Sequence, residues 1–242
     1  MPNNTVYKKY QGKCDYSYTL GAFPTIELLK NKPEHVIKVL IHPDMDSAEQ
    51  FSILTDLCGK NGIDLVTSKA EVERLRDKEN IFCVGLFNKY NGKLNDSKGH
   101  IVLVNPGDMG NLGTIIRTAI GFGFNDLAII EPAADIFNPK VVRASMGALF
   151  QLRFRRYESF NEYALENKDR VFYPFMLKGA TDLQTLKRDI NEKFALIFGN
   201  EATGLPDEFA EKGKSILIRH EKTIDSLNLS MACGIALYEF AK

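Results

Sequence analysis

The sequence has few cysteines and no excess of positive or negative charge, and each of these two features argues against a class of protein. The four cysteines lie far apart, without metal-ligand spacing, which argues against a disulfide framework or a zinc site and favours reduced thiols. Lys+Arg and Asp+Glu both number 31, so the chain is not a polybasic nucleic-acid binder. A local basic patch stays open, because steering depends on how charge is distributed rather than on its sum.

Long hydrophobic runs are also missing. The apolar stretches last a few residues, far short of the ~20 that cross a bilayer, and the N-terminus shows no secretory signal. We therefore expect a cytoplasmic protein with no membrane association and no bound metal. A chain of 242 residues has room for one large or two small domains.

A polar, glycine-punctuated stretch at 88–99 is the best candidate for a linker and predicts two domains, residues 1–97 and 98–242. Strand-like and helix-like segments alternate on both sides of it. This rhythm is typical of an α/β fold with a parallel sheet covered on both faces. We predict strands at 36–41, 63–66, 81–87, 101–105, 126–130, 171–175, 194–198 and 215–218, and helices at 47–58, 71–76, 109–122 and 227–240.

A glycine-rich loop runs into a helix over residues 105–117. Backbone N–H groups at such a helix start can bind an anion. Gly107, Gly110 and Gly113 are spaced by three, so they do not form the GxGxxG dinucleotide fingerprint, and the P-loop lysine is missing. Arg117 follows inside a mostly apolar helix, where a buried guanidinium needs either a structural carboxylate or a substrate as its partner.

Two later segments also follow predicted strands. In the stretch 196–206, Gly199 and Gly204 lie on either side of Asn200 and Glu201, which is typical of a close approach to a ligand or of a plain strand–turn–helix corner. Further on, Asp225 and Ser226 are suitable N-caps for the last helix. Capping accounts for one of them but not for Ser226, Asn228 and Ser230 together. Because ligands bind at the carboxyl ends of parallel strands, all three segments are expected to face one crevice.

Arginines gather in one further strand-like stretch. Arg153 and Arg155 alternate, so they share one strand face and could contact phosphates. A solvated strand edge explains the same pattern.

Together these segments resemble the three ordered motifs of the SpoU (TrmH) family of RNA methyltransferases. The motif residues are Asn111…Arg117, Gly199-Asn200-Glu201…Gly204-Leu205 and Ser226-Leu227-Asn228-Leu229-Ser230, and residues 138–148 also look like that family. The resemblance covers residues 98 to the end, and the first 97 residues look like the small α/β substrate-binding domain often fused to it. Ile218-Arg219-His220 departs from the family's usual Ile-Pro-Met, which removes a fixed turn beside the expected adenosine pocket.

The resemblance implies a homodimer whose parallel-sheet domain ends in a deep trefoil knot and transfers a methyl group from S-adenosylmethionine to a ribose 2′-hydroxyl of tRNA or rRNA. It implies that Arg117 contacts that hydroxyl and stabilises the developing oxyanion, while Asn111, Ser226 and Asn228 orient the arginine and the ribose or phosphate. Glu201 would fix Arg117 or help shape the site. Residues carried over to the methyl donor are Gly199, Asn200, Gly204, Ile218 and Leu227, and the candidates for contacting structured RNA are Arg143, Arg153 and Arg155.

Two other functions remain open. One is a catalytically inactive RNA-binding protein of the same fold, and the other is a nucleotide-dependent oxidoreductase. Binding of S-adenosylmethionine separates the first from an active enzyme, and the glycine spacing argues against the second. The acceptor, ribose or base, is not determined by these motifs.

Overall fold

The computed structural model describes residues 6–96, 99–178, 181–221 and 223–241, which pack into two compact units. The first unit runs to Tyr90 and also includes Asp135–Gln151, and the second takes the rest. The predicted boundary at 97 and 98 lies outside the described residues. The division also differs from the predicted one in the segment 135–151, which packs with the first unit because the Ser17 hydroxyl donates to the Phe137 carbonyl at 2.5 Å and the Phe150 ring meets that of Phe87.

The first unit is built on a four-stranded sheet in the order β1-β4-β2-β3. β1 and β2 both run antiparallel to β4, whereas β2 and β3 are parallel. Hydrophobic side chains from its helices and strands pack into buried clusters. Strand β4 is buried over its first five residues, as expected for an inner strand. Its strands are Tyr16–Tyr18 (β1), Val36–Ile41 (β2), Leu65–Thr67 (β3) and Cys83–Asn88 (β4), and its helices are Ala22–Asn31 (α1), Ala48–Asn61 (α2), Lys69–Leu75 (α3) and Pro139–Ala144 (α5).

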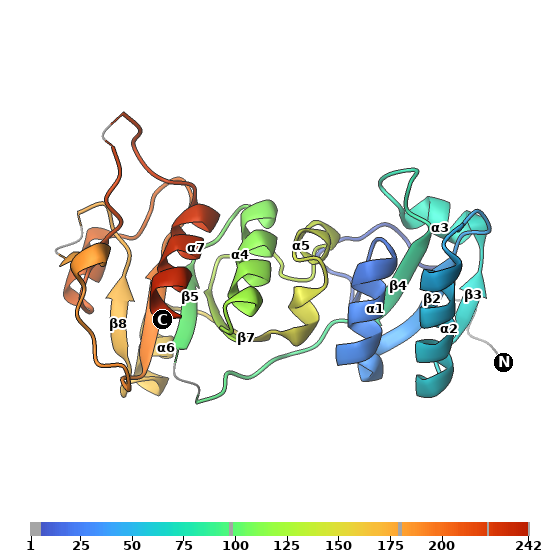
Figure 1. Cartoon of the computed structure of the whole chain (residues 1–242), viewed down its shortest axis with the longest axis horizontal. Coiled ribbons are helices and arrows are strands. Elements are labelled where there is room, and N and C mark those ends of the chain that lie inside the picture. Colours follow the sequence, from blue (N-terminus) through green and yellow to red (C-terminus); the bar gives the residue numbers. More distant parts are fainter. Residues whose placement is uncertain (1–5, 97–98, 179–180, 222, 242) are drawn as a thin grey trace. The chain divides into compact units, whose positions relative to one another are not determined.

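The second unit is a five-stranded, wholly parallel sheet in the order β7-β6-β5-β10-β8 (Figure 1). The prediction of an α/β fold with a parallel sheet is therefore confirmed. The inner strand β10 is buried at every residue, which explains its unbroken apolar sequence. The strands are Gly99–Val104 (β5), Asp126–Ile130 (β6), Arg153–Tyr157 (β7), Val171–Pro174 (β8) and Phe194–Phe198 (β10), and the helices are Met109–Gly121 (α4), Phe160–Glu166 (α6) and Leu229–Phe240 (α7).

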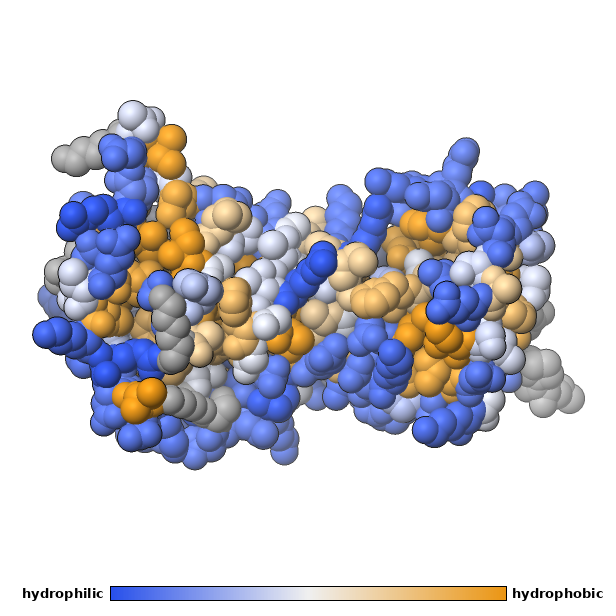
Figure 2. Space-filling view, viewed as in Figure 1, coloured by the Kyte–Doolittle hydropathy of each residue, from blue (hydrophilic) through white to orange (hydrophobic). Residues whose placement is uncertain are grey.

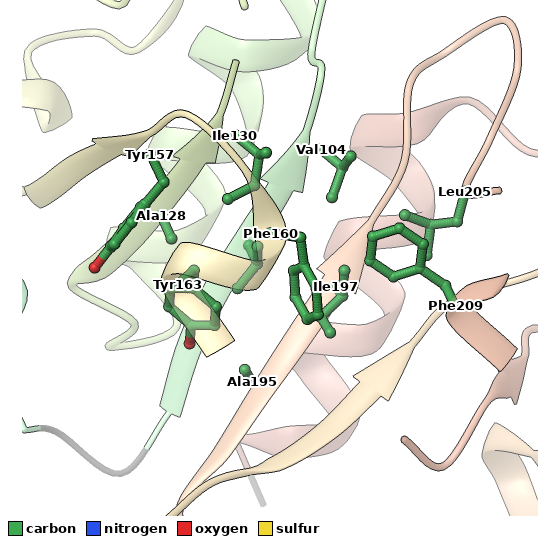
Figure 3. Close-up of a cluster of buried hydrophobic side chains, with 11 residues drawn as sticks. Val104, Ala128, Ile130, Tyr157, Phe160, Tyr163, Ala195, Ile197, Leu205 and Phe209 are labelled. Atoms are coloured by element: carbon green, nitrogen blue, oxygen red, sulfur yellow. The ribbon is translucent and has the colours of Figure 1, made fainter. Parts of the chain in front are cut away.

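Helices cover this parallel sheet. Figure 3 shows Phe160 and Tyr163 of α6 packed with Ala128, Ile130 and Ile197 of the strands. Helices α4 and α7 pack against each other and lie side by side in Figure 1. Each helix is long enough to bury an apolar stripe against the strands, which is how such a sheet is stabilised.

The last helix begins later than its predicted caps. Asn228 is the N-cap residue, because its Oδ1 accepts from the backbone N–H of Ser230 at 2.9 Å and of Met231 at 3.4 Å. The prediction that Asp225 or Ser226 caps this helix is therefore wrong. The predicted strand at 215–218 shrinks to Ile216–Leu217 (β11), which pairs in parallel with Thr181–Asp182 (β9) as a separate two-stranded sheet.

Part of the predicted linker is packed onto the second unit. A Cβ on Gly92 would lie 2.2 Å from the Phe154 carbonyl oxygen, so only glycine fits there. The Asn95 N–H donates to the carboxylate of Asp126 at 2.8 Å, and the Asn95 carbonyl lies 2.8 Å from Nε2 of His100. Residues 91–96 therefore form a strap over the edge strand β7 rather than a free connection.

All four cysteines are free thiols, in agreement with the prediction of no disulfide framework. Burial raises the pKa of Cys58 to about 11 and that of Cys83 to about 12. Thiols with such pKa values stay protonated and unreactive near neutral pH. In the described part of the chain, no helix is both long and apolar enough to cross a membrane.

Candidate active site

A pocket of about 300 Å³ opens beside the carboxyl ends of β8 and β10. Its volume lies at the lower end of the range for small-molecule sites. The walls come from four separate stretches of chain: residues 175–178 after β8, the loop after β10, the end of β11 with the segment after it, and the start of α7 with the residues just before it. They include all five residues carried over to the methyl donor, Gly199, Asn200, Gly204, Ile218 and Leu227, together with Glu201 and Ser226.

The loop after β10 folds back tightly on itself. A Cβ on Gly199 would lie 2.2 Å from the carbonyl carbon of Gly204, so any side chain there would force the two backbones apart. Gly204 adopts φ +67°, a left-handed conformation that glycine adopts without strain, and its N–H donates to the Asn200 carbonyl at 2.9 Å. The Asn200 side chain accepts from the N–H of Ala202 at 2.9 Å. The turn is thus fixed by its own backbone, with its peptide groups lining the pocket.

Glu201 binds the loop that precedes α4. Its Oε2 accepts from the N–H of Gly107 at 3.0 Å, and its Oε1 accepts from the N–H of Asp108 at 3.1 Å. Within the described part of the chain Glu201 forms no ion pair with Arg117, and its carboxylate holds the loop before α4 instead. The backbone N–H groups that were predicted to bind an anion donate to the Glu201 carboxylate, so the anion that they bind belongs to the protein itself. A dinucleotide pyrophosphate would have to displace it, which argues against the oxidoreductase alternative.

A second contact fixes the same loop from the opposite side. The Asn200 Nδ2 donates to the Asn105 carbonyl at 2.8 Å, and the Asn105 Nδ2 donates to the Glu131 carbonyl at 2.7 Å. Asn105 adopts φ +53°, an uncommon conformation for a residue other than glycine. Backbone in this region is held only where its surroundings impose it, and here two side-chain amides do so.

The first and third motifs meet at the N-termini of two helices. The Asn228 Nδ2 donates to the Asn111 Oδ1 at 3.0 Å, which joins α7 to α4. The Ser230 hydroxyl donates to Oδ1 of the same Asn228 at 2.7 Å. The three sequence motifs, far apart along the chain, are therefore joined: the second and third line the pocket, and the first is hydrogen-bonded to both.

Arg117 lies on the outer side of α4. The expectation of a buried guanidinium is wrong, because the side chain is exposed. No carboxylate among the residues with described positions comes within ion-pair distance of it. A structural carboxylate partner is thus excluded within this part of the chain, and the guanidinium can meet a group from outside.

Side-chain contacts hold the segment Ile218-Arg219-His220, where the resemblance implies Ile-Pro-Met. Arg219 forms an ion pair with Asp182 of β9 at 2.9 Å, and the Nδ1 of His220 lies 3.0 Å from the Ile218 carbonyl oxygen. Since a carbonyl can only accept, Nδ1 carries the proton in this bond. These side-chain contacts hold the stretch in which the resemblance led us to expect a proline, and His220 lines the pocket.

The three arginines predicted to contact RNA are each paired with a carboxylate. Arg143 bonds to Asp77 at 2.7 Å in the first unit. In the second unit, Arg153 donates twice to the buried Asp126, at 2.8 and 2.6 Å, and Arg155 donates twice to Glu166. The hydrogen bond with Asp126 raises the pKa of Arg153. Sequence reasoning missed these partners, because nothing in a single sequence marks a carboxylate 11 to 66 positions away as a neighbour.

The described residues contain no group of three or more side chains placed to hold a metal ion.

Comparison with known proteins agrees with the motifs. The family description "SpoU rRNA Methylase family" matches residues 98–238. The 23S rRNA (uridine(2479)-2′-O)-methyltransferase of Streptomyces viridochromogenes is 32% identical over 140 residues, 55% of this chain and 49% of that protein. The 23S rRNA (guanosine(2553)-2′-O)-methyltransferase RlmP of Bacillus subtilis is 32% identical over 134 residues, 54% of this chain and 53% of that protein. The chain thus spans about half the length of these relatives, and 27% of a small-subunit rRNA methyltransferase of Syntrophobacter fumaroxidans.

Solved structures match nearly the whole chain. An AdoMet-bound rRNA methyltransferase from Sinorhizobium meliloti aligns with a TM-score of 0.78 at 25% identity, covering 93% of this chain and 87% of that one. The SpoU methyltransferase AviRb from Streptomyces viridochromogenes aligns with a TM-score of 0.80 at 21% identity, covering 94% and 89%, which shows a common fold. With the three motifs joined by hydrogen bonds and more than half of its length matched, the chain belongs to the SpoU rRNA methylase family.

Proposed function

We propose that this protein is an S-adenosylmethionine-dependent RNA methyltransferase that methylates a ribose 2′-hydroxyl in tRNA or rRNA. The observation that carries the proposal is that the second and third motifs line one pocket at the end of a parallel sheet, while hydrogen bonds from Glu201 and Asn228 join the first motif to them. The names of the relatives support the acceptor class, since both 23S rRNA enzymes are 2′-O-methyltransferases.

The pocket has suitable walls for the methyl donor. Leu217, Ile218, Leu227 and Leu229 supply apolar surface, and the turn at 199–205 supplies peptide groups for hydrogen bonds to an adenosine part. S-adenosylmethionine, when bound, supplies an electrophilic sulfonium methyl group. The protein's task is then to align the acceptor hydroxyl and to stabilise its developing charge, and alignment alone can lower a barrier by ~7–11 kcal/mol.

Arg117 is the residue that stabilises the acceptor oxygen. An arginine stays protonated at neutral pH, so its contribution is electrostatic rather than that of a base. Its exposed guanidinium has no ion-pair partner among the described side chains, which leaves it free for substrate. Asn111 and Asn228 fix the helix that carries it, and Ser226 lies in the pocket wall beside them.

The working form is a homodimer that pairs through α4 and α7. Met231, Ile235 and Tyr238 are exposed at helical spacing on α7, and the Tyr238 ring packs against the exposed Phe122 at the end of α4. The surface over these helices is mostly pale to orange in Figure 2, whereas blue dominates much of the remaining surface. A second copy of the chain would cover this apolar face.

The dimer has its own test. Met231→Glu places a charge on the proposed interface and should lower the mass measured by analytical ultracentrifugation from dimer to monomer, with an unchanged circular dichroism spectrum. Glu239→Gln, on the same helix, serves as the control for a change of charge. A wild-type protein that is monomeric at all concentrations contradicts the dimer.

Further parts of the proposal rest on family membership. These are the trefoil knot at the C-terminal end, the role of residues 1–97 in binding structured RNA, and the contacts of Arg143, Arg153 and Arg155 with that RNA. The convergence of 199–205 and 226–232 on one pocket supports the knot. The free thiols and the RNA substrate support a cytoplasmic location.

The decisive experiment compares Arg117→Ala with the wild type. We expect S-adenosylmethionine to bind both proteins equally in calorimetry, because Arg117 does not line the pocket. Transfer of labelled methyl groups to RNA lacking the modification should fall by about 10²–10³-fold, as for loss of an oxyanion-stabilising group. Lys187→Ala, another exposed cation without an ion pair in the described structure, should leave both measurements unchanged.

The outcomes separate the alternatives. Wild-type transfer rates in Arg117→Ala remove this residue from the mechanism. A wild-type protein that binds RNA but not S-adenosylmethionine is the inactive RNA-binding alternative, for which the departure at Arg219-His220 is the structural reason.

A further inference from the structure

A histidine lines the methyl-donor pocket at a position to which the resemblance assigns no role. His220 lies in the segment after β11, two residues beyond Ile218, and both residues belong to the pocket wall. The resemblance implies a methionine at this position, and a thioether is only a weak hydrogen-bond acceptor. A strong hydrogen bond from residue 220 to a ligand is therefore a property of this chain.

The imidazole of His220 has a defined hydrogen-bonding pattern. Its Nδ1 lies 3.0 Å from the Ile218 carbonyl oxygen and carries the ring proton, because a carbonyl only accepts. In the neutral imidazole the second nitrogen, Nε2, then has a lone pair and no proton. Among the residues whose positions the structure describes, none forms a hydrogen bond with Nε2. The ring thus offers the pocket one unused acceptor.

The other polar side chains of the pocket wall are bound elsewhere or face the solvent. Asn200 and Glu201 form hydrogen bonds with backbone groups of the loops that they hold. His220 is half-buried, so water competes less for its Nε2 than for an exposed group. The remaining polar side chains of the wall are exposed: Lys178, Thr203, Asp207 and Ser226.

The surroundings of this acceptor suit a flat, uncharged base. The rings of Phe175 and Phe198 stack at 4.6 Å in the same pocket wall, and Ile218 adds apolar surface beside His220. A charged ammonium group would lose its hydration here in exchange for an uncharged partner, which is costly. The exocyclic amino group of an adenine ring is a neutral N–H donor, so it can satisfy Nε2 without that cost.

We propose that His220 is a specificity-determining residue of the donor pocket, whose Nε2 accepts a hydrogen bond from the exocyclic amino group of the adenine of S-adenosylmethionine. This inference rests on the proposed function and deepens it. A purine with an oxo group in place of the amine presents an acceptor to an acceptor, which leaves both without a partner. The pocket therefore distinguishes an adenine from a hypoxanthine base.

The test is calorimetric titration of the full chain with S-adenosylhomocysteine and with S-inosylhomocysteine, which has an oxo group in place of the amine. His220→Asn keeps an amide N–H near the place of Nδ1 and has no atom at the place of Nε2, so the contact with Ile218 can persist while the acceptor is lost. We expect the preference for the adenosyl compound to fall by about tenfold, through weaker binding of that compound.

Two further variants complete the comparison. The side-chain amide oxygen of His220→Gln reaches the place of Nε2, so this variant should recover part of the preference. His35→Asn is the matched control, because it makes the same substitution in the first unit and should leave both affinities unchanged.

Three outcomes overturn the proposal. An unchanged preference in His220→Asn shows that other groups bind the amine. An equal loss of affinity for both compounds shows that the imidazole only holds its own segment or contacts the ribose. The third ligand, 5′-methylthioadenosine, has the adenine but no ammonium group. If its affinity is the same in His220→Asn and the wild type, Nε2 contacts the amino-acid end of the donor instead.

The proposed function has a separate readout. Methyl transfer to RNA by the wild type tests that function, whereas the preference between the two compounds is measured without turnover. A wild type that methylates RNA with a preference independent of residue 220 contradicts this inference alone. A wild type whose preference depends on His220 but that does not methylate RNA contradicts the proposed function alone, and one that binds neither compound contradicts both.

Discussion

Arg153 offers a direct test of whether an arginine predicted to contact RNA is a structural group instead. Its guanidinium donates to both oxygens of Asp126, which is 1% exposed as a side chain and also accepts from the Asn95 N–H. Arg153→Ala removes the cation and leaves a buried carboxylate without its charge partner. Breaking a fully buried pair in this way costs about 3–5 kcal/mol.

The expected loss is smaller here because Arg153 is itself 36% exposed, so water screens part of the interaction. We expect the free energy of unfolding to fall by about 2–3 kcal/mol. For a protein of this size, each kcal/mol shifts the midpoint of thermal unfolding by about 2–4 °C. The midpoint should therefore fall by about 4–12 °C.

Thermal and urea unfolding followed by circular dichroism measure this effect. Arg155→Ala is the matched control, since Arg155 and Glu166 are both more than one-third exposed and such surface pairs contribute about 0–1 kcal/mol. If Arg153→Ala is as stable as Arg155→Ala, the reasoning is refuted. A fall in RNA affinity of folded Arg153→Ala, without loss of stability, would support the proposed contact of Arg153 with RNA.

Two further predictions follow from buried groups of the second unit. Burial lowers the pKa of His100, so the unfolded chain binds a proton more readily than the folded one, and the free energy of unfolding should fall as the pH drops from about 7 to about 5. Urea unfolding at both pH values should show a smaller fall in His100→Gln, and equal falls in the two proteins contradict this assignment. Gly199→Ala places a Cβ 2.2 Å from the carbonyl carbon of Gly204, so we expect S-adenosylmethionine affinity to drop more than about tenfold in calorimetry. Gly59→Ala, with open space around its Cβ, is the control, and equal affinities in the two variants would contradict the role of the turn.

Much of the second unit could be predicted because its signals are local. The apolar run 194–198 predicted β10 over its full length, and Asp126–Ile130 likewise matches β6. The periodicity from Met109 predicted α4 to within one residue of its end. These segments agree in local propensity and in burial, so their sequence alone determines the element type.

The sequence predicted which residues belong to the site, but it did not predict which atoms those residues contact. Motif order named Glu201, yet the partners of its carboxylate are backbone N–H groups, which no residue identity reveals. Arg117 was expected to be buried because its helix is mostly apolar, although helical periodicity lets one position on an apolar helix face outward. The cap at Asn228 was missed because Asp225 and Ser226 are equally good capping types, and only backbone geometry distinguishes them.

The grouping of Asp135–Gln151 with the first unit has a practical consequence for dissecting the protein. The chain passes between the two units three times, after Tyr90, after Ala134 and after Gln151, so no single cut separates them. A fragment starting at residue 98 would carry Phe137, Leu149 and Phe150 without the surface that buries them, and should aggregate on expression. Domain exchange with another member of the family would have to transplant both pieces together.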